Sequence, residues 1–125
     1  MPTPSKPTES KKFLFLFRSR EDLPDLSPEE MQKVFGKWVA WINEFKASGR
    51  YVSSAPLEEG GRVLSGPRGS SVVDGPFAEA KEVVGGYLLF TANSLDEATE
   101  LGKGCPGFER GGILEVRQVT SLEGL

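Results

Sequence analysis

The segment Phe13-Leu14-Phe15-Leu16-Phe17 is apolar at every position. Side chains alternate between the two faces of a β-strand, so a strand built from this segment is apolar on both faces. Both faces of its sheet must therefore be covered, because an uncovered face would expose a larger apolar patch than monomeric proteins usually tolerate. This requirement constrains the fold more than any other feature of the chain.

The helix that can cover one face is expected at residues 28–48. It starts at Ser27-Pro28-Glu29-Glu30, which supplies a capping serine, a proline at the first helical position and a glutamate that completes a capping box. Gly49 provides the left-handed stop. Eight apolar side chains recur at helical spacing and predict one broad stripe facing the core: Met31, Val34, Phe35, Trp38, Val39, Trp41, Ile42 and Phe45.

A second, shorter helix opens at Ser94-Leu95-Asp96-Glu97, where another capping box is expected. Core strands are predicted at residues 13–17, 50–57, 85–92 and 113–119. The resulting order β-α-β-β-α-β is the ferredoxin-like pattern. The sequence therefore predicts an α+β fold of the ferredoxin-like type.

At 125 residues the chain has room for one domain and one core. Residues 1–11 hold three prolines among polar residues, which predicts a disordered N-terminal tail. The domain is expected to cover residues 12–120, and residues 121–125 are expected to form a C-terminal tail.

The connection over residues 58–84 is longer than a ferredoxin-like unit needs, and long connections are often functional. We predict an inserted β-hairpin there, with strands at residues 62–64 and 72–73 and a turn at Gly66-Pro67-Arg68-Gly69.

Two helices cover only one face of a four-stranded sheet. Leu14 and Leu16 point away from the phenylalanines of their strand, and Tyr87 points away from Leu88, so apolar side chains lie on both faces. The simplest cover for the second face is the same face of another copy. We therefore predict a homodimer through the sheet face, which would form a dimeric α/β barrel.

Composition excludes several partners and compartments. The formal net charge is -3 and no stripe of Lys and Arg stands out, which argues against direct nucleic-acid binding. No apolar run approaches the roughly 20 residues of a membrane-spanning helix. Cys105 is the single cysteine and cannot form an internal disulfide, which favours a cytoplasmic location.

The chain contains no histidine. Histidine-based catalytic pairs within one chain and histidine-ligated metal sites are therefore excluded. The sequence indicates no metal site and no cofactor, and proton transfer would have to use carboxylates, Tyr, Lys, the thiol or water.

The long connection ends in Asp74-Gly75-Pro76-Phe77-Ala78-Glu79-Ala80-Lys81-Glu82, followed by Gly85-Gly86-Tyr87. This segment closely resembles the signature of the YCII-related proteins, in the DGPF subgroup named after its tetrapeptide. The resemblance covers about residues 12–119, including the first strand, both helix starts, Cys105-Pro106 and Glu115-Val116-Arg117. It implies a dimeric α/β barrel in a bacterial protein.

The resemblance also bears on function. Some YCII-related proteins pair a histidine on the first helix with an aspartate in a cleft. Here the helical position holds Trp38, so only Asp74 of that pair is carried over. DGPF proteins are often encoded beside extracytoplasmic-function sigma factors, which implies a sigma factor or another transcription regulator as a partner.

Asp74 is the candidate catalytic residue, as an acid/base or as a ligand anchor. An acid/base role at neutral pH would require burial that raises its pKa. The alternative is a turn carboxylate that accepts backbone N–H groups.

Six further residues are candidates for ligand binding, and Lys81 could pair with an anionic substrate. They are Phe77, Glu79, Lys81, Trp38, Arg18 and Arg117. The structural alternatives are a solvated charged face for Glu79 and Lys81, core packing for Trp38, and an ion pair between Glu115 and Arg117 on one strand face. Four residues are expected to shape the backbone by positive φ or close approach: Gly75, Pro76, Gly85 and Gly86.

Two functions follow from these residues, and a third reading is a structural dimer whose signature only shapes a turn. The first is a small-molecule-binding dimer that uses Asp74. Whether it catalyses a reaction, and which one, is left open. The second is a non-catalytic binding module accessory to transcription regulation.

Overall fold

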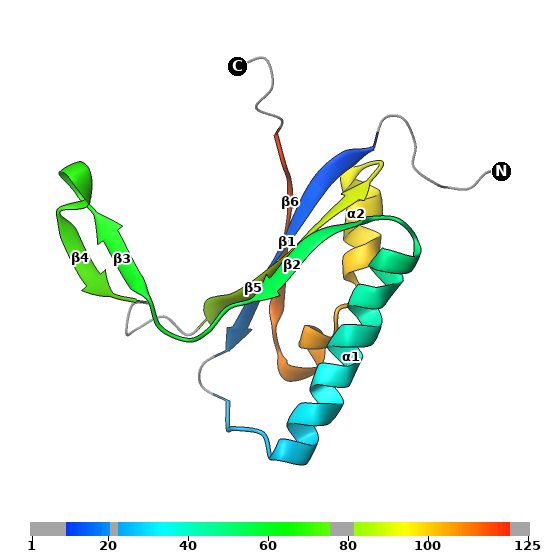
Figure 1. The fold of residues 1–125 in the computed structure, drawn as a ribbon, viewed down its shortest axis with the longest axis horizontal. Coiled ribbons are helices and arrows are strands. Elements are labelled where there is room, and N and C mark those ends of the chain that lie inside the picture. Colours follow the sequence, from blue (N-terminus) through cyan, green and yellow to red (C-terminus); the bar gives the residue numbers. More distant parts are fainter. Residues whose placement is uncertain (1–9, 21–22, 76–81, 121–125) are drawn as a thin grey trace.

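The computed structural model of the chain describes residues 10–20, 23–75 and 82–120. Its strands and helices follow the predicted α+β order (Figure 1). The elements are β1 Lys11–Arg20, α1 Pro28–Ala47, β2 Tyr51–Pro56, β3 Arg62–Ser65, β4 Ser71–Asp74, β5 Glu82–Ala92, α2 Leu95–Gly102 and β6 Ile113–Gln118, with short 3₁₀ segments η1 Pro67–Gly69 and η2 Pro106–Arg110.

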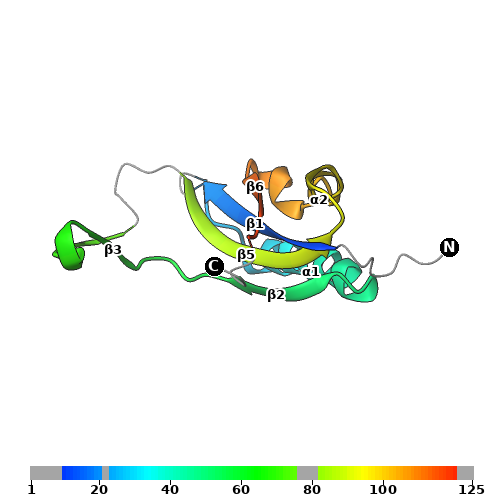
Figure 2. The ribbon, with the colours of Figure 1, turned by 90° about the horizontal axis from the view of Figure 1, so that it is seen from above.

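The main sheet has the strand order β2-β5-β1-β6, and all neighbouring strands are antiparallel. This is the order of a ferredoxin-like sheet, in which the two strands that precede helices, β1 and β5, lie in the centre. Both helices lie on one side of the sheet (Figures 1 and 2). The prediction that one sheet face has no helical cover within the chain is therefore confirmed for the described residues.

The core lies between the helices and the sheet and is strongly aromatic. Phe15 of β1 is fully buried, and its ring centroid lies 4.3 Å from that of Phe90 on β5. Trp41 of α1 stacks on Phe15 at 5.8 Å, and Phe45 packs edge-on against both Trp41 and Phe90. The alternation along β1 places its phenylalanines in this core, as the first strand predicts.

The start of α1 is the one predicted from its sequence. The Ser27 hydroxyl accepts the Glu30 N–H at 3.1 Å, and the Glu30 carboxylate accepts the Ser27 N–H at 3.0 Å, so both halves of the capping box form. After the helix, Gly49 adopts a φ of 77°, which gives the left-handed stop.

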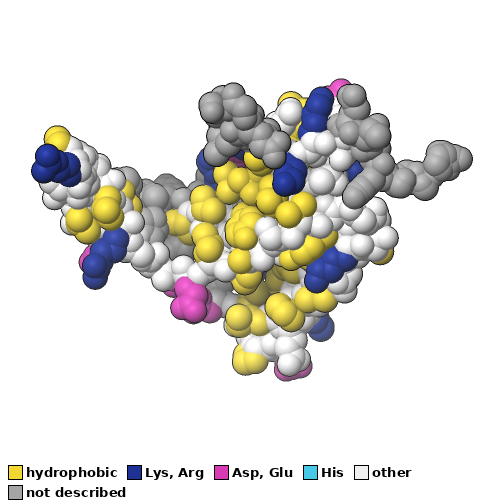
Figure 3. All heavy atoms as spheres, turned by 45° about the horizontal axis from the view of Figure 1, so that its top comes forward, with side chains coloured by type: hydrophobic (Ala, Val, Ile, Leu, Met, Phe, Trp, Pro, Cys, Tyr) yellow, Lys and Arg dark blue, Asp and Glu magenta, His cyan; other side chains and the backbone are white. Residues whose placement is uncertain are grey.

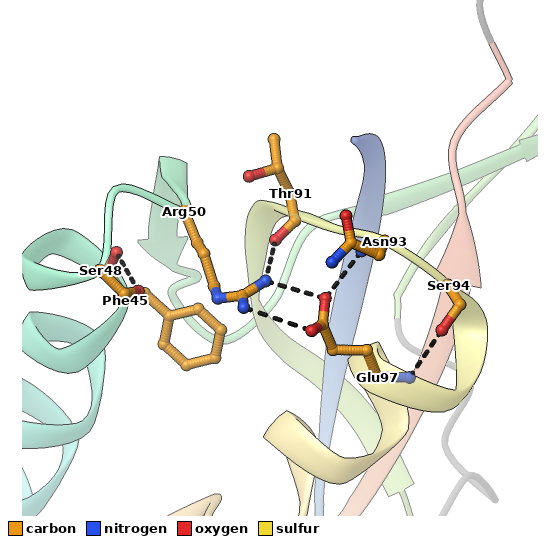
Figure 4. Close-up of polar contacts among 7 residues, drawn as sticks. All are labelled: Phe45, Ser48, Arg50, Thr91, Asn93, Ser94 and Glu97. Atoms are coloured by element: carbon orange, nitrogen blue, oxygen red, sulfur yellow. Dashed lines mark hydrogen bonds and ion pairs between the residues drawn. The ribbon is translucent and has the colours of Figure 1, made fainter. Parts of the chain in front are cut away.

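The capping box predicted for α2 is only half formed, which corrects the expectation. Ser94 accepts the Glu97 N–H at 3.1 Å, but the Glu97 carboxylate accepts the N–H of Asn93 at 2.7 Å instead of that of Ser94 (Figure 4). The same carboxylate binds Arg50 at 3.1 and 3.4 Å, which draws it toward the start of β2.

The apolar stripe of α1 is also narrower than predicted. Trp41 and Phe45 are buried and Trp38 and Ile42 pack against the core, but three members of the stripe are exposed: Met31, Phe35 and Val39. The N-terminal turns of α1 extend beyond the end of the sheet (Figure 1), so that part of the helix has no sheet to pack on.

Strands β3 and β4 form a separate two-stranded sheet, paired from Arg62 with Asp74 to Ser65 with Ser71 and joined through η1. This β3–β4 arm projects from the body on the side of the sheet opposite the helices (Figures 1 and 2). Its apolar side chains are largely exposed, with Leu64 at 60%, Val72 at 52% and Val73 at 44%. No helix among the described residues is long and apolar enough to cross a membrane.

Candidate functional site

The sheet face that points away from the helices is apolar at its centre. Leu14 and Leu16 of β1 pair with Leu89 and Tyr87 of β5, so these four side chains share this face, and all four are only partly buried. Figure 3 shows hydrophobic side chains gathered over the middle of the molecule, to the right of the arm. We call this surface the open face.

Charged residues flank the open face along β6. The register places Glu115 opposite Leu16 and Arg117 opposite Leu14, so both charged side chains lie on the open face. Arg117 Nη1 donates to Glu115 Oε2 at 3.2 Å, and Arg18 Nη2 donates to Glu115 Oε1. The predicted ion pair between Glu115 and Arg117 is therefore present, and Arg18 extends it to three residues.

The cluster of Arg18, Glu115 and Arg117 has two guanidinium groups for one carboxylate, which leaves one positive charge in excess. Hydrogen bonds from Arg117 and then from Arg18 hold the pKa of Glu115 below its ordinary value. Arg18 Nε is buried and has no hydrogen-bond partner among the described residues. A buried donor without an acceptor is unfavourable.

Trp38 lies on the other side of the sheet, where its ring packs edge-on against Phe17 at 4.9 Å and Trp41 at 5.9 Å. A Cβ at Gly107 would lie 3.2 Å from the Trp38 ring, so the indole is closely enclosed. A single chain therefore does not bring Trp38 together with Arg18 and Arg117, because the sheet separates them.

Asp74 is the last residue of β4, in the arm. Its side chain is 97% exposed, and its ionic partner among the described residues is Arg62, with 3.8 Å between Nε and Oδ1. The next residue, Gly75, donates its N–H to the Gly61 carbonyl at 3.0 Å, and a Cβ there would lie 2.5 Å from Val63. Four residues of the predicted site lie outside the described residues: Pro76, Phe77, Glu79 and Lys81.

Gly85 and Gly86 lie at a close approach of strands. A Cβ at Gly86 would lie 2.8 Å from the Ala55 carbonyl oxygen of β2, and one at Gly85 would lie 3.1 Å from the Ser19 hydroxyl. Neither glycine is among those with positive φ. Their geometry is that of close backbone packing between β2, β5 and β1.

A shallow hollow lies on the outer side of α1, lined by Met31, Gln32, Phe35 and Gly36. Sequence reasoning missed it, because Met31 and Phe35 were assigned to the core stripe. The signal that could have found it is the i, i+4, i+8 spacing of Met31, Phe35 and Val39, which is rotated from the Trp38–Trp41–Phe45 row. In the described part of the chain no group of three acidic or cysteine side chains could hold a metal ion.

A family model of the YCII-related domain matches residues 12–123. The chain belongs to the YCII-related family. No curated protein matches the chain. The family match agrees with the ferredoxin-like sheet and with the resemblance in the sequence, and it names a domain without an activity.

Proposed function

We propose that this YCII-related domain is a homodimeric small-molecule-binding protein. Two copies pair their open faces into a dimeric α/β barrel, and the ligand is a small organic anion with an apolar body. Its acid group binds at Arg18 and Arg117, and its apolar part lies against Leu16 and Tyr87. The observation that carries the proposal is the cluster of Arg18, Glu115 and Arg117 beside an apolar sheet face that the chain's own helices leave uncovered.

The apolar centre of the open face supports the dimer. Burial of apolar surface contributes about 25 cal/mol per Å², and a second copy supplies the same apolar side chains in return. Two ferredoxin-like sheets that meet face to face at about 10 Å bring both central strands into contact.

The arginines support an anionic ligand. A guanidinium group presents planar donors that match a carboxylate or a phosphate. Glu115 orients both guanidinium groups but neutralises only one of them, and a pocket between two sheets would exclude water and strengthen the remaining attraction.

Asp74 enters the proposal as a ligand anchor or an acid/base. Its side chain is exposed in the single chain, so either role requires that a second copy or the ligand covers the base of the arm. Membership of the DGPF subgroup rests on Asp74-Gly75-Pro76-Phe77 and is part of the same proposal. The cytoplasmic location remains a prediction from the single cysteine.

The dimer is tested by sedimentation of wild type and Leu16→Asp at tens of micromolar. Leu16→Asp places a charge at the centre of the open face and is expected to give monomers. Leu95→Asp is the matched control, since Leu95 is 51% exposed at the start of α2, and it is expected to leave the dimer intact. A monomeric wild type would refute the dimer.

The ligand class is tested by the rise in melting temperature with benzoate, compared with neutral benzamide. Benzoate alone is expected to stabilise wild type, and Arg117→Gln is expected to abolish the shift. Arg62→Gln, in the arm, is the control and should retain it. Equal shifts with benzoate and benzamide would refute an anion site.

The alternative of an accessory to transcription regulation remains a prediction from the resemblance. Specific recovery of a sigma factor with wild type, lost in Leu16→Asp but retained in Leu95→Asp, would instead make the open face a surface for that partner.

A further inference from the structure

Two apolar surfaces have no role in the proposed barrel. One is the β3–β4 arm, where Leu64, Val72 and Val73 are exposed. The other is the hollow on α1, where Phe35 is 69% and Met31 58% exposed. An exposed pair of large side chains beside a hollow is typical of a surface that receives an apolar group.

Charge contributes little to a contact between the two surfaces. The arm holds Arg62 and Arg68, but Arg62 is paired with Asp74. On α1, Glu29 and Lys33 are four residues apart on the same side of the helix, so their charges offset each other. A contact between the surfaces would therefore be made by their apolar side chains.

The arm's position allows it to reach a second copy. It projects from the open-face side of the sheet, so a copy placed on that face would lie beside it (Figures 1 and 2). The arm and the N-terminal half of α1 lie at the same end of the sheet (Figure 1). A two-fold axis parallel to the strands therefore brings the arm of each copy to the α1 end of the other.

The arm is long enough to reach the helices of a second copy placed on the open face. Residues 57–61 and the four residues of β3 can extend to about 30 Å at about 3.3 Å per residue. The partner's sheet would lie about 10 Å away and its helix layer about another 10 Å beyond. The tip of the arm can therefore pass the partner's sheet and reach its helices.

We propose that the β3–β4 arm of each copy docks on the α1 hollow of the other, with Leu64 against Met31 and Phe35. The inference deepens the proposed dimer and rests on it. In this arrangement the arm packs on a second copy, and the exposed side chains of the α1 stripe are covered by that copy's arm. It also places Asp74, at the base of the arm, beside the junction of the two copies.

Disulfide trapping tests the contact. In a Cys105→Ser background, a Leu64→Cys chain is mixed with a Phe35→Cys chain and oxidised with copper phenanthroline. The mixture is expected to give a covalent dimer within minutes. A mixture of Leu64→Cys with Leu95→Cys is the control and is expected to give at least tenfold less.

The outcomes separate the two proposals. A wild type that sediments as a dimer without Leu64–Phe35 trapping would overturn the arm contact and leave the barrel standing. Trapping that persists at the same rate in the Leu16→Asp background would show that the contact does not depend on the sheet-face dimer, and would overturn the proposed placement of the arm. A double Leu64→Cys/Phe35→Cys chain that closes on itself as a monomer would show that the arm folds back on its own helix, and the inference would fail.

A second measurement needs no cysteine. Leu64→Ser and Phe35→Ser are each expected to weaken dimerisation at least fivefold in sedimentation, and the double variant is expected to weaken it no further than the stronger single change. Additive losses would contradict a direct contact between these side chains.

Discussion

The Arg50 guanidinium lies 3.1 Å from the Glu97 carboxylate and joins the entry to β2 with the first turn of α2 (Figure 4). Arg50 also donates to the Thr91 carbonyl at 3.1 Å, next to the end of β5. Arg50 thus adds a side-chain link between the two βαβ halves of the fold, at the corner where β2, β5 and α2 meet.

Glu97→Gln is expected to lower the free energy of unfolding by about 1 kcal/mol at pH 7, because it removes a charged acceptor that is only partly exposed. The Asn93 N–H, and then Arg50, lower the pKa of Glu97 in the folded protein. Its stabilising effect is therefore complete above the unfolded pKa of about 4.3 and is lost as the pH falls through the lower folded value.

Urea unfolding at pH 7 and pH 3 measures this effect, and the difference between wild type and Glu97→Gln should shrink at pH 3. The control is Glu100→Gln on the same helix, which removes an exposed pair with Lys103 and should change stability by less than about 0.5 kcal/mol. An equal loss at both pH values would contradict the ionic explanation.

Glu115 is expected to titrate below free glutamate in an NMR experiment that follows its carboxyl carbon. Arg117→Gln should raise the pKa of Glu115 toward its ordinary value, because the Arg117 hydrogen bond is the largest cause of the depression. Arg62→Gln should not move it. An unchanged pKa of Glu115 in Arg117→Gln would mean that the 3.2 Å contact does not persist in solution.

Gly86→Ala is expected to destabilise the protein by about 1–3 kcal/mol, since the added Cβ would lie 2.8 Å from a backbone oxygen that cannot move without displacing β2. Gly36→Ala, the same change on an exposed helix with open space around it, should raise stability by up to about 1 kcal/mol. Thermal unfolding of both variants checks the contrast. Similar effects of the two changes would argue against close packing of β2 on β5.

Cys105 is expected to react slowly with Ellman's reagent at pH 8 in the folded protein. Its side chain is buried, and burial raises the pKa of the thiol despite an opposing hydrogen bond from the Gly107 backbone. A Leu95→Cys variant, with an exposed second thiol, provides the fast reference. Rapid labelling of Cys105 in native wild type would contradict the packing around it.

The parts of the fold that depend on local chemistry could be predicted from sequence. The capping box formed by Ser27 and Glu30 marks the start of α1, and Gly49 marks its end. The alternation in β1 predicted both the aromatic core around Phe15 and the apolar open face. These signals need only the period of a strand or a helix.

Features that depend on tertiary geometry were harder to predict. Met31 and Phe35 are exposed because the N-terminal turns of α1 extend beyond the sheet, and helix periodicity does not report the length of a sheet. Val39 is exposed because it is rotated from the row that faces the core. Glu97 turns from its own cap to Arg50, which lies 47 residues away in sequence. The direction of the arm, which places Asp74 away from the helix side, likewise depends on the path of residues 57–61 in space.

The arm turns through Gly66 and Arg68, which both adopt positive φ, and pairs its strands through its own backbone hydrogen bonds. The aromatic core, for its part, closes inside one chain. Formation of the proposed dimer would therefore need no refolding of either chain. In that dimer, exchange of subunits between labelled and unlabelled protein should proceed by dissociation alone, and its rate should not follow the effect of denaturant on the core.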